Sequence, residues 1–204
     1  MDILKRLSDS SRPVVTDGAM GTLLQAKLPG FRGCFELLNI DKPEIVAEIH
    51  RMYIDAGAEL IETNTFGANA IKLAEYGLAS RCREINREAA KLAKKAAGGR
   101  AFVGGDISSA GKLVEPMGEA TYDKIYASYV EQIKGLEEGG ADLLIIETMT
   151  DVQEAKIALN AAKAHSKLPV LCSISFEENG STISGSSVTA GLATLAAHGA
   201  DIVG

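Results

Sequence analysis

The chain has 204 residues, of which 46% are hydrophobic and 24% are charged, and its formal net charge is -6. This is the composition of a globular chain that is long enough to bury one sizeable core. Its acidic balance, with no basic run longer than Lys94-Lys95, argues against a nucleic-acid surface, because phosphate binding needs clustered Lys and Arg. No apolar run approaches the roughly 20 residues that span a bilayer.

Short apolar runs alternate along the chain with longer segments of helical periodicity. We expect strands at residues 13–17, 59–63, 101–106, 142–148 and 169–176, with a further strand beginning at 200–204. Helices are expected over residues 41–56, 70–76, 80–97, 121–138, 152–165 and 187–198, and residues 23–41 are expected to form a loop. Asp41 is the expected N-cap of the first of these helices, because Pro43 and Glu44 follow it.

An internal repeat indicates how these elements are arranged. The segment Gly57-Ala58-Glu59-Leu60-Ile61 recurs as Gly140-Ala141-Asp142-Leu143-Leu144 and again as Gly199-Ala200-Asp201-Ile202-Val203. Each copy is typical of a C-cap glycine, a small residue, a surface acid and the start of a buried strand. Strands that alternate with helices in this way form a parallel sheet with right-handed crossovers.

We therefore expect an α/β fold, a TIM (β/α)8 barrel. A closed barrel needs ~250 residues, so this chain is expected to form only the N-terminal portion, with about five βα units and the start of strand six. Residues 1–204 would then be one partial barrel domain, truncated at its C-terminal end. Residues 1–7 are expected to form a short amphipathic helix at the barrel floor.

Polar residues follow the apolar run of several predicted strands. Asp17, Asn64, Asp106 and Glu147 each stand at or just past such a strand end. In a parallel barrel the carboxyl ends of the strands share one face, and active sites lie on that face. The pattern predicts a polar binding site there.

Several motifs, in order and at similar spacings, resemble those of the homocysteine S-methyltransferase family, especially the N-terminal module of cobalamin-dependent methionine synthases. They are Asp17-Gly18-Ala19-Met20-Gly21-Thr22, Glu36-Leu37-Leu38-Asn39, Thr63-Asn64-Thr65-Phe66-Gly67-Ala68-Asn69, Gly105-Asp106-Ile107 and Glu147-Thr148. The resemblance implies a barrel that binds homocysteine at the strand ends and transfers a methyl group to its thiolate, making methionine. The methyl donor it implies is methylcobalamin, carried on another domain or subunit, with betaine or a sulfonium donor left open.

The resemblance also implies roles for particular residues. Asp17 and Glu147 are expected to bind the ammonium group of homocysteine, and the backbone amides of Gly18 and Ala19 its carboxylate. Three further substrate-binding candidates, at neighbouring strand ends, are Thr63, Asn64 and Asp106. Glu62 repeats the position of Glu147 but is not included, because the resemblance does not require an acid there.

Each of these roles has a plainer alternative. Asp17 and Glu147 could simply cap the helices that follow them. The polar groups of Thr63, Asn64 and Asp106 could serve only hydrogen bonds within turns.

In this family three cysteines bind a zinc ion that holds the homocysteine sulfur as a thiolate. The resemblance places those cysteines after strand six and near strand eight, beyond Gly204, and Cys34, Cys82 and Cys172 stand in other contexts. Zinc is therefore expected only in the full-length protein. No metal ligand and no catalytic residue is assigned within this chain, which alone is expected to be inactive.

Two other functions remain open at this point. One is a different TIM-barrel enzyme, of lyase or aldolase type, although no lysine stands at a predicted strand end for Schiff-base chemistry. The other is a non-catalytic half-barrel that pairs with another chain through its exposed sheet edge. Three widely spaced cysteines are typical of a reducing compartment, so a cytoplasmic location is expected.

Overall fold

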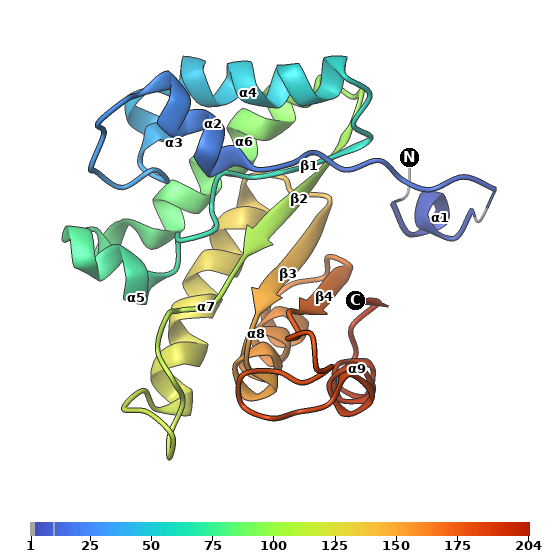
Figure 1. Ribbon diagram of the computed structural model, residues 1–204. Coiled ribbons are helices and arrows are strands. Elements are labelled where there is room, and N and C mark those ends of the chain that lie inside the picture. The colour runs from blue at the N-terminus through green and yellow to red at the C-terminus, as the bar shows by residue number, and fades with distance from the viewer. Residues whose placement is uncertain (1–2, 10) are drawn as a thin grey trace.

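The computed structural model describes residues 3–9 and 11–204. Its secondary structure alternates helices and strands along the chain (Figure 1). The elements are α1 (Ile3–Leu7), α2 (Met20–Lys27), α3 (Leu38–Asp41), α4 (Pro43–Asp55), β1 (Leu60–Glu62), α5 (Ala70–Leu73), η1 (Ala74–Tyr76), η2 (Ala79–Arg81), α6 (Cys82–Ala97), β2 (Phe102–Ile107), α7 (Tyr122–Glu138), β3 (Leu143–Met149), α8 (Val152–His165), β4 (Val170–Ile174), α9 (Val188–Ala197) and β5 (Ile202–Val203).

The strands form one five-stranded sheet in the order β1-β2-β3-β4-β5, and every neighbouring pair is parallel. The strand order follows the chain order, as in successive βα units of a barrel. This confirms the expected α/β barrel portion, with β5 at the predicted start of strand six. The repeat glycines Gly57, Gly140 and Gly199 have φ of 108°, 90° and 88°, which suits their predicted place after helices.

The two faces of the sheet bury different partners. On the outer face, Leu144 and Ile146 of β3 lie in the main core cluster with residues of α7 and α8. On the inner face, Leu60, Leu143 and Ile145 form a smaller cluster with Ile3 of α1. The expected N-terminal helix therefore covers the barrel interior over Ile3–Leu7, while residues 1 and 2 lie outside the described part of the chain.

Several predicted boundaries are wrong. Residues 13–17 form no regular strand, although they lie beside β1: Thr16 bridges Leu60 in parallel, and the Asp17 amide donates to the Leu60 carbonyl at 3.0 Å. The expected loop at residues 23–41 contains most of α2 and all of α3. Asp41 ends α3, and the N-cap of α4 is Lys42, whose side chain makes no capping bond.

Close packing of α6 against α7 depends on a glycine. A Cβ added to Gly135 of α7 would lie 2.5 Å from the Arg83 carbonyl oxygen and 2.8 Å from Asn86 Cβ. The backbone of α6 cannot move aside cheaply, so this position accepts no side chain.

We therefore expect Gly135→Ala to lower the free energy of unfolding by about 1–3 kcal/mol, although alanine favours helix by ~1 kcal/mol over glycine. Gly21→Ala is the matched control, because Gly21 is also helical and a Cβ there meets nothing within 4 Å. Urea unfolding of both variants is the measurement. Equal stability of Gly135→Ala and the parent would contradict this packing.

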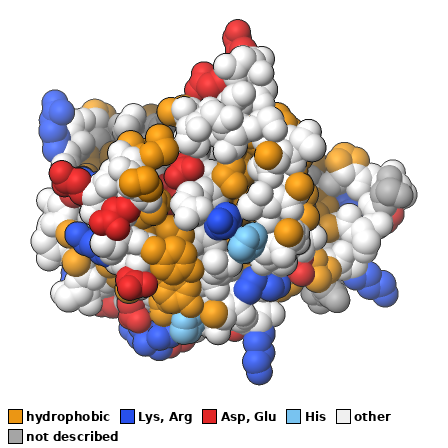
Figure 2. All heavy atoms as spheres, turned by 90° about the horizontal axis from the view of Figure 1, so that it is seen from below, with side chains coloured by type: hydrophobic (Ala, Val, Ile, Leu, Met, Phe, Trp, Pro, Cys, Tyr) orange, Lys and Arg blue, Asp and Glu red, His pale blue; other side chains and the backbone are white. Residues whose placement is uncertain are grey.

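The surface seen from below in Figure 2 shows a hydrophobic patch with charges of both signs scattered around it. No extended basic area is visible on this face, in line with the charge balance of the sequence. Within residues 3–9 and 11–204, no helix has the length and hydropathy needed to cross a membrane.

Candidate functional site

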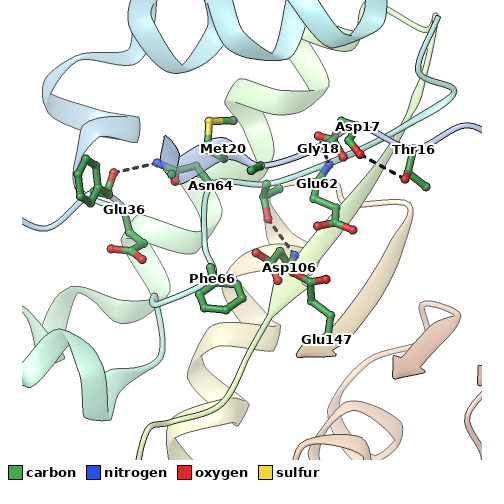
Figure 3. A pocket seen from close by; sticks show the side chains of 14 residues that line it. Thr16, Asp17, Gly18, Met20, Glu36, Glu62, Asn64, Phe66, Asp106 and Glu147 are labelled. Carbon is green, nitrogen blue, oxygen red and sulfur yellow. Dashed lines mark hydrogen bonds between the residues drawn. The ribbon is translucent and has the colours of Figure 1, made fainter. Parts of the chain in front are cut away.

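A cavity of about 560 Å³ opens where β1, β2 and β3 end. The segment around the start of α2 and residues near Phe35 complete its wall (Figure 3). Five carboxylic acids line it: Asp17, Glu36, Glu62, Asp106 and Glu147. In the part of the chain that the structure describes, no Lys, Arg or His lines this cavity. The cavity is therefore suited to a ligand that carries positive charge.

Strand alternation explains why the acids converge. Side chains two apart on a strand share a face, so Glu62 lies on the face of Leu60, and Glu147 on the face of Leu143 and Ile145. These apolar residues fill the barrel interior, and the acids follow them at its mouth. The β3–β4 register shifts between Ile146 and Met149, and Thr148 has a φ of 52°. Glu147 thus projects from an irregular strand end, a common feature near binding sites.

Asp17 is held in place by the neighbouring strand. Its Oδ2 accepts a hydrogen bond from the Glu62 amide at 2.9 Å. Burial, with a further contribution from the negative charge of Glu147, raises the pKa of Asp17 to about 6, against the opposing effect of this hydrogen bond. A buried carboxylate with a raised pKa gains most from a cationic partner.

Burial also raises the pKa of three of the other four acids in the cavity, namely Glu62, Glu147 and Asp106. Burial, then the charges of Glu147 and Asp17, raises the pKa of Glu62 to about 8. Burial raises the pKa of Glu147, and it raises that of Asp106 well above the usual value, with added repulsion from Glu62 and Glu147. Asp106 is only 4% exposed, and its Oδ1 has no hydrogen-bond partner.

The structure places all seven predicted substrate-binding residues on this one cavity: Asp17, Gly18, Ala19, Thr63, Asn64, Asp106 and Glu147. Their role in binding stays a prediction. Helix capping does not explain the two main acids, because α2 has Ala19 at its N-cap without a side-chain bond, and Asp151 caps α8.

Thr63 and Asn64 are engaged in holding the loop after β1. Thr63 Oγ1 accepts from the Asp106 amide at 3.0 Å, and Asn64 Nδ2 donates to the Phe35 carbonyl at 2.8 Å. This agrees with the turn-bonding alternative for their side chains, so any role in ligand binding is added to a structural one.

Sequence reasoning missed two of the acids in the cavity. Glu62 is not among the predicted site residues, although it precedes Thr63 in the internal repeat as Glu147 precedes Thr148, and this match is the signal that could have identified it. Glu36 was noted only as part of a motif, and its carboxylate accepts from the Gly67 amide at 2.8 Å and from Cys34 Sγ at 3.1 Å.

The cysteines of this chain do not fit a zinc ion bound by three thiolates. Cys34 contacts Glu36, Cys82 Sγ donates to the Ala68 carbonyl, and Cys172 lies within β4. Burial raises the pKa of each to about 12, which keeps them as thiols. Among the described residues, the one cluster of three potential metal ligands is Glu62, Asp106 and Glu147.

Comparison with known proteins gives consistent results. Methionine synthase of Mycobacterium tuberculosis is 34% identical over 212 residues, which cover 96% of this chain and 18% of that protein. Methionine synthase of Mycobacterium leprae is 34% identical over 220 residues, covering 100% of this chain and again 18% of the relative. The chain thus spans less than a fifth of the length of these relatives.

Among solved structures, the metallated form of the homocysteine methyltransferase MmuM from Escherichia coli superposes with a TM-score of 0.82 at 22% identity, over 96% of this chain and 74% of that one. At this identity the likeness shows the fold. The profile of the family described as Homocysteine S-methyltransferase matches residues 14–204. Because that match spans nearly the whole of the described sheet and its cavity, this chain belongs to the homocysteine S-methyltransferase family.

Proposed function

We propose that this chain is the homocysteine-binding part of a methyltransferase that methylates the homocysteine thiolate and makes methionine. The observation that carries the proposal is the cavity at the strand ends, which combines several carboxylic acids with exposed backbone at the start of α2. Family membership and the likeness to methionine synthases favour homocysteine as the amino acid.

The two ends of an amino acid match the two kinds of group in the cavity. Asp17 and Glu147 are the proposed partners of the ammonium group, because both carboxylates line the cavity and their charges repel each other until a cation enters. The amides of Gly18 and Ala19, beside the first turn of α2, are the proposed donors to the carboxylate. Neither acid is a proposed catalytic residue, since both act on the end of the substrate that does not react.

Activation of the sulfur requires more than this chain contains. The zinc ion of the family supplies thiolate stabilisation when bound, and we place its three cysteine ligands beyond Gly204. The proposed methyl donor is methylcobalamin on another domain or subunit, as the methionine synthase relatives suggest. The chain alone is then inactive and binds its substrate weakly. We propose a cytoplasmic location, consistent with three free cysteines.

Isothermal titration of the protein with L-homocysteine tests the proposal against the other barrel chemistries. We expect weak, saturable binding, with Kd on the order of 1 mM, equivalent to about 4 kcal/mol. A sugar phosphate such as ribose 5-phosphate is expected not to bind, because five acids line the cavity and no basic side chain among the described residues does. Binding of the sugar phosphate without binding of homocysteine would overturn the assignment.

A further inference from the structure

Three of the cavity acids form a cluster of their own. Glu62, Asp106 and Glu147 come from the consecutive strands β1, β2 and β3, and each offers a carboxylate oxygen within 4.8 Å of the other two. Figure 3 shows the three side chains converging below the start of α2. Proximity of acids alone does not make a binding site. A ligand is indicated only if a carboxylate of the cluster is buried and lacks a hydrogen-bond partner.

Asp106 is the member of the cluster that points to a ligand. Asp106 is only 4% exposed to solvent, and its Oδ1 is buried without a hydrogen-bond partner. Its backbone cannot turn away, because the amide donates to Thr63 Oγ1 at 3.0 Å and the carbonyl accepts from Thr65 Oγ1 at 2.7 Å. Leaving a buried acceptor unpaired costs about 1–3 kcal/mol, more for a charged group.

Charge in the surroundings makes that cost larger. Among the residues that the structure describes, the charged side chains that act on Asp106 are all acids, namely Glu62, Glu147, Asp17 and Glu36. None of these carboxylates has an ion pair among the described residues. A single ammonium group at Asp17 and Glu147 neutralises one negative charge and leaves Glu62 and Asp106 facing each other.

The oxygen spacing suits a small divalent ion. Oxygens on opposite sides of one ion lie about 4.2 Å apart for Mg²⁺ and about 4.6–5.2 Å apart for Ca²⁺, twice the metal–oxygen distances. Each of the three acids offers an oxygen that lies within 4.8 Å of the oxygens of the other two, so one ion of this size can contact all three after small side-chain adjustments. All three ligands are carboxylate oxygens, which favour hard cations over zinc. The cavity, at about 560 Å³, has room for the waters that complete the coordination.

We infer that Glu62, Asp106 and Glu147 bind one hard divalent cation of the Mg²⁺, Mn²⁺ or Ca²⁺ class. This site goes beyond the proposed function: it is separate from a zinc bound by cysteines, and no metal ligand within the chain follows from the sequence. It shares Glu147 with the proposed ammonium site, while Asp17, Gly18 and Ala19 stay on the α2 side of the cavity. The bound cation would hold the three carboxylates in place at the base of the cavity in which the amino acid is proposed to bind.

Mn²⁺ titration of the EDTA-treated protein at about pH 8, without any amino acid, tests the site. Free Mn²⁺ is measured by its electron paramagnetic resonance signal. We expect one saturable site per chain, displaced by Mg²⁺ or Ca²⁺. Asp106→Asn should weaken Mn²⁺ binding about tenfold or more, because the affinity of an oxygen site rises with the charge of its ligands. Glu62→Gln should act in the same direction.

Glu36→Gln is the matched control, because it removes one acid from the same cavity without removing a proposed ligand, and Gln can still accept from the Gly67 amide. It should change the affinity by no more than about threefold, as expected for a change in local charge alone. Circular dichroism identifies folded variants, and Glu62→Gln replaces Asp106→Asn if the latter does not fold. The inference fails if the parent shows no saturable binding, if the ligand variants bind as the parent does, or if Glu36→Gln weakens binding as much as they do. Because no homocysteine is present, such a failure leaves the proposed amino-acid site untouched.

Discussion

Glu62→Gln is expected to raise the free energy of unfolding at pH 8 by up to about 4 kcal/mol in metal-free buffer, at ~1.4 kcal/mol for each unit by which the pKa of Glu62 is raised. The carboxyl group of Glu62 is partly buried and faces Glu147 and Asp17, and its pKa rises to about 8 for these reasons. Ionisation in the folded protein is therefore costly, whereas in the unfolded chain it is not. Glutamine keeps a similar shape without the charge, so the variant avoids that cost.

The sign follows from proton linkage. A group whose pKa is higher in the folded state stabilises the fold fully below its unfolded pKa, which is about 4.5 for Glu62, and the contribution is lost as the pH rises through about 8. The raised pKa values of Asp17 and Asp106 act in the same direction. The unfolding free energy of the parent should thus fall between about pH 6.5 and pH 8.5, and that of Glu62→Gln should fall less.

Urea unfolding at about pH 6.5, 7.5 and 8.5 is the measurement. Lower pH is avoided because burial lowers the pKa of His50 to about 4, so its protonation in the unfolded chain lowers stability as the pH falls below about 6.5. Glu59→Gln is a control in which we expect the opposite change in stability. Hydrogen bonds from Arg6 hold the pKa of Glu59 below its usual value, so loss of the Glu59 charge should destabilise the fold. If the stability of the parent protein does not change between about pH 6.5 and pH 8.5, the proposed cost of ionising these buried, mutually repelling acids is wrong.

Asp17→Asn and Glu147→Gln are each expected to weaken homocysteine binding by about 1.5–3 kcal/mol, the loss that follows removal of a hydrogen bond to a charged group. Both carboxylates line the same cavity, and the charge of one raises the pKa of the other. The ammonium group of the ligand relieves this repulsion, and a neutral amide cannot replace the charge. Calorimetry is best done on a polypeptide that extends past Gly204 over the whole of the proposed barrel, because we expect the further strands to tighten binding.

Asp142→Asn is the control for that measurement. Asp142 directly precedes β3, at the end opposite to Glu147, and its carboxylate pairs with Lys94 Nζ at 2.8 Å. Its replacement should leave homocysteine affinity unchanged, even if it lowers stability. Zinc content should also stay the same in all three variants, because none of these acids is a proposed zinc ligand. If Asp17→Asn and Glu147→Gln both bind homocysteine as the parent does, the assignment of the ammonium site is wrong.

Local patterns in the sequence were enough to predict the fold. Apolar runs of strand length, helical periodicity and the recurring glycine before an acid each depend on neighbouring residues, and together they predict a parallel sheet in chain order. The same patterns place Asp17, Asp106 and Glu147 at strand ends, so their meeting at one edge of the sheet was predictable once the strands were parallel.

Tertiary structure alone decided the rest. Residues 13–17 form a bridge to Leu60 and a few backbone hydrogen bonds beside β1 in place of the predicted regular strand. The internal repeat hints at the place of Glu62, but the pairing of the strands decides which acids meet it: Glu62 pairs with Gly104, two residues before Asp106, and Asp106 pairs with Ile145, two residues before Glu147. The unpaired Oδ1 of Asp106 likewise results from burial by segments distant in the chain. Periodicity acts over a few residues and can be read along the chain, whereas the packing that brings side chains together and removes their water depends on the whole fold.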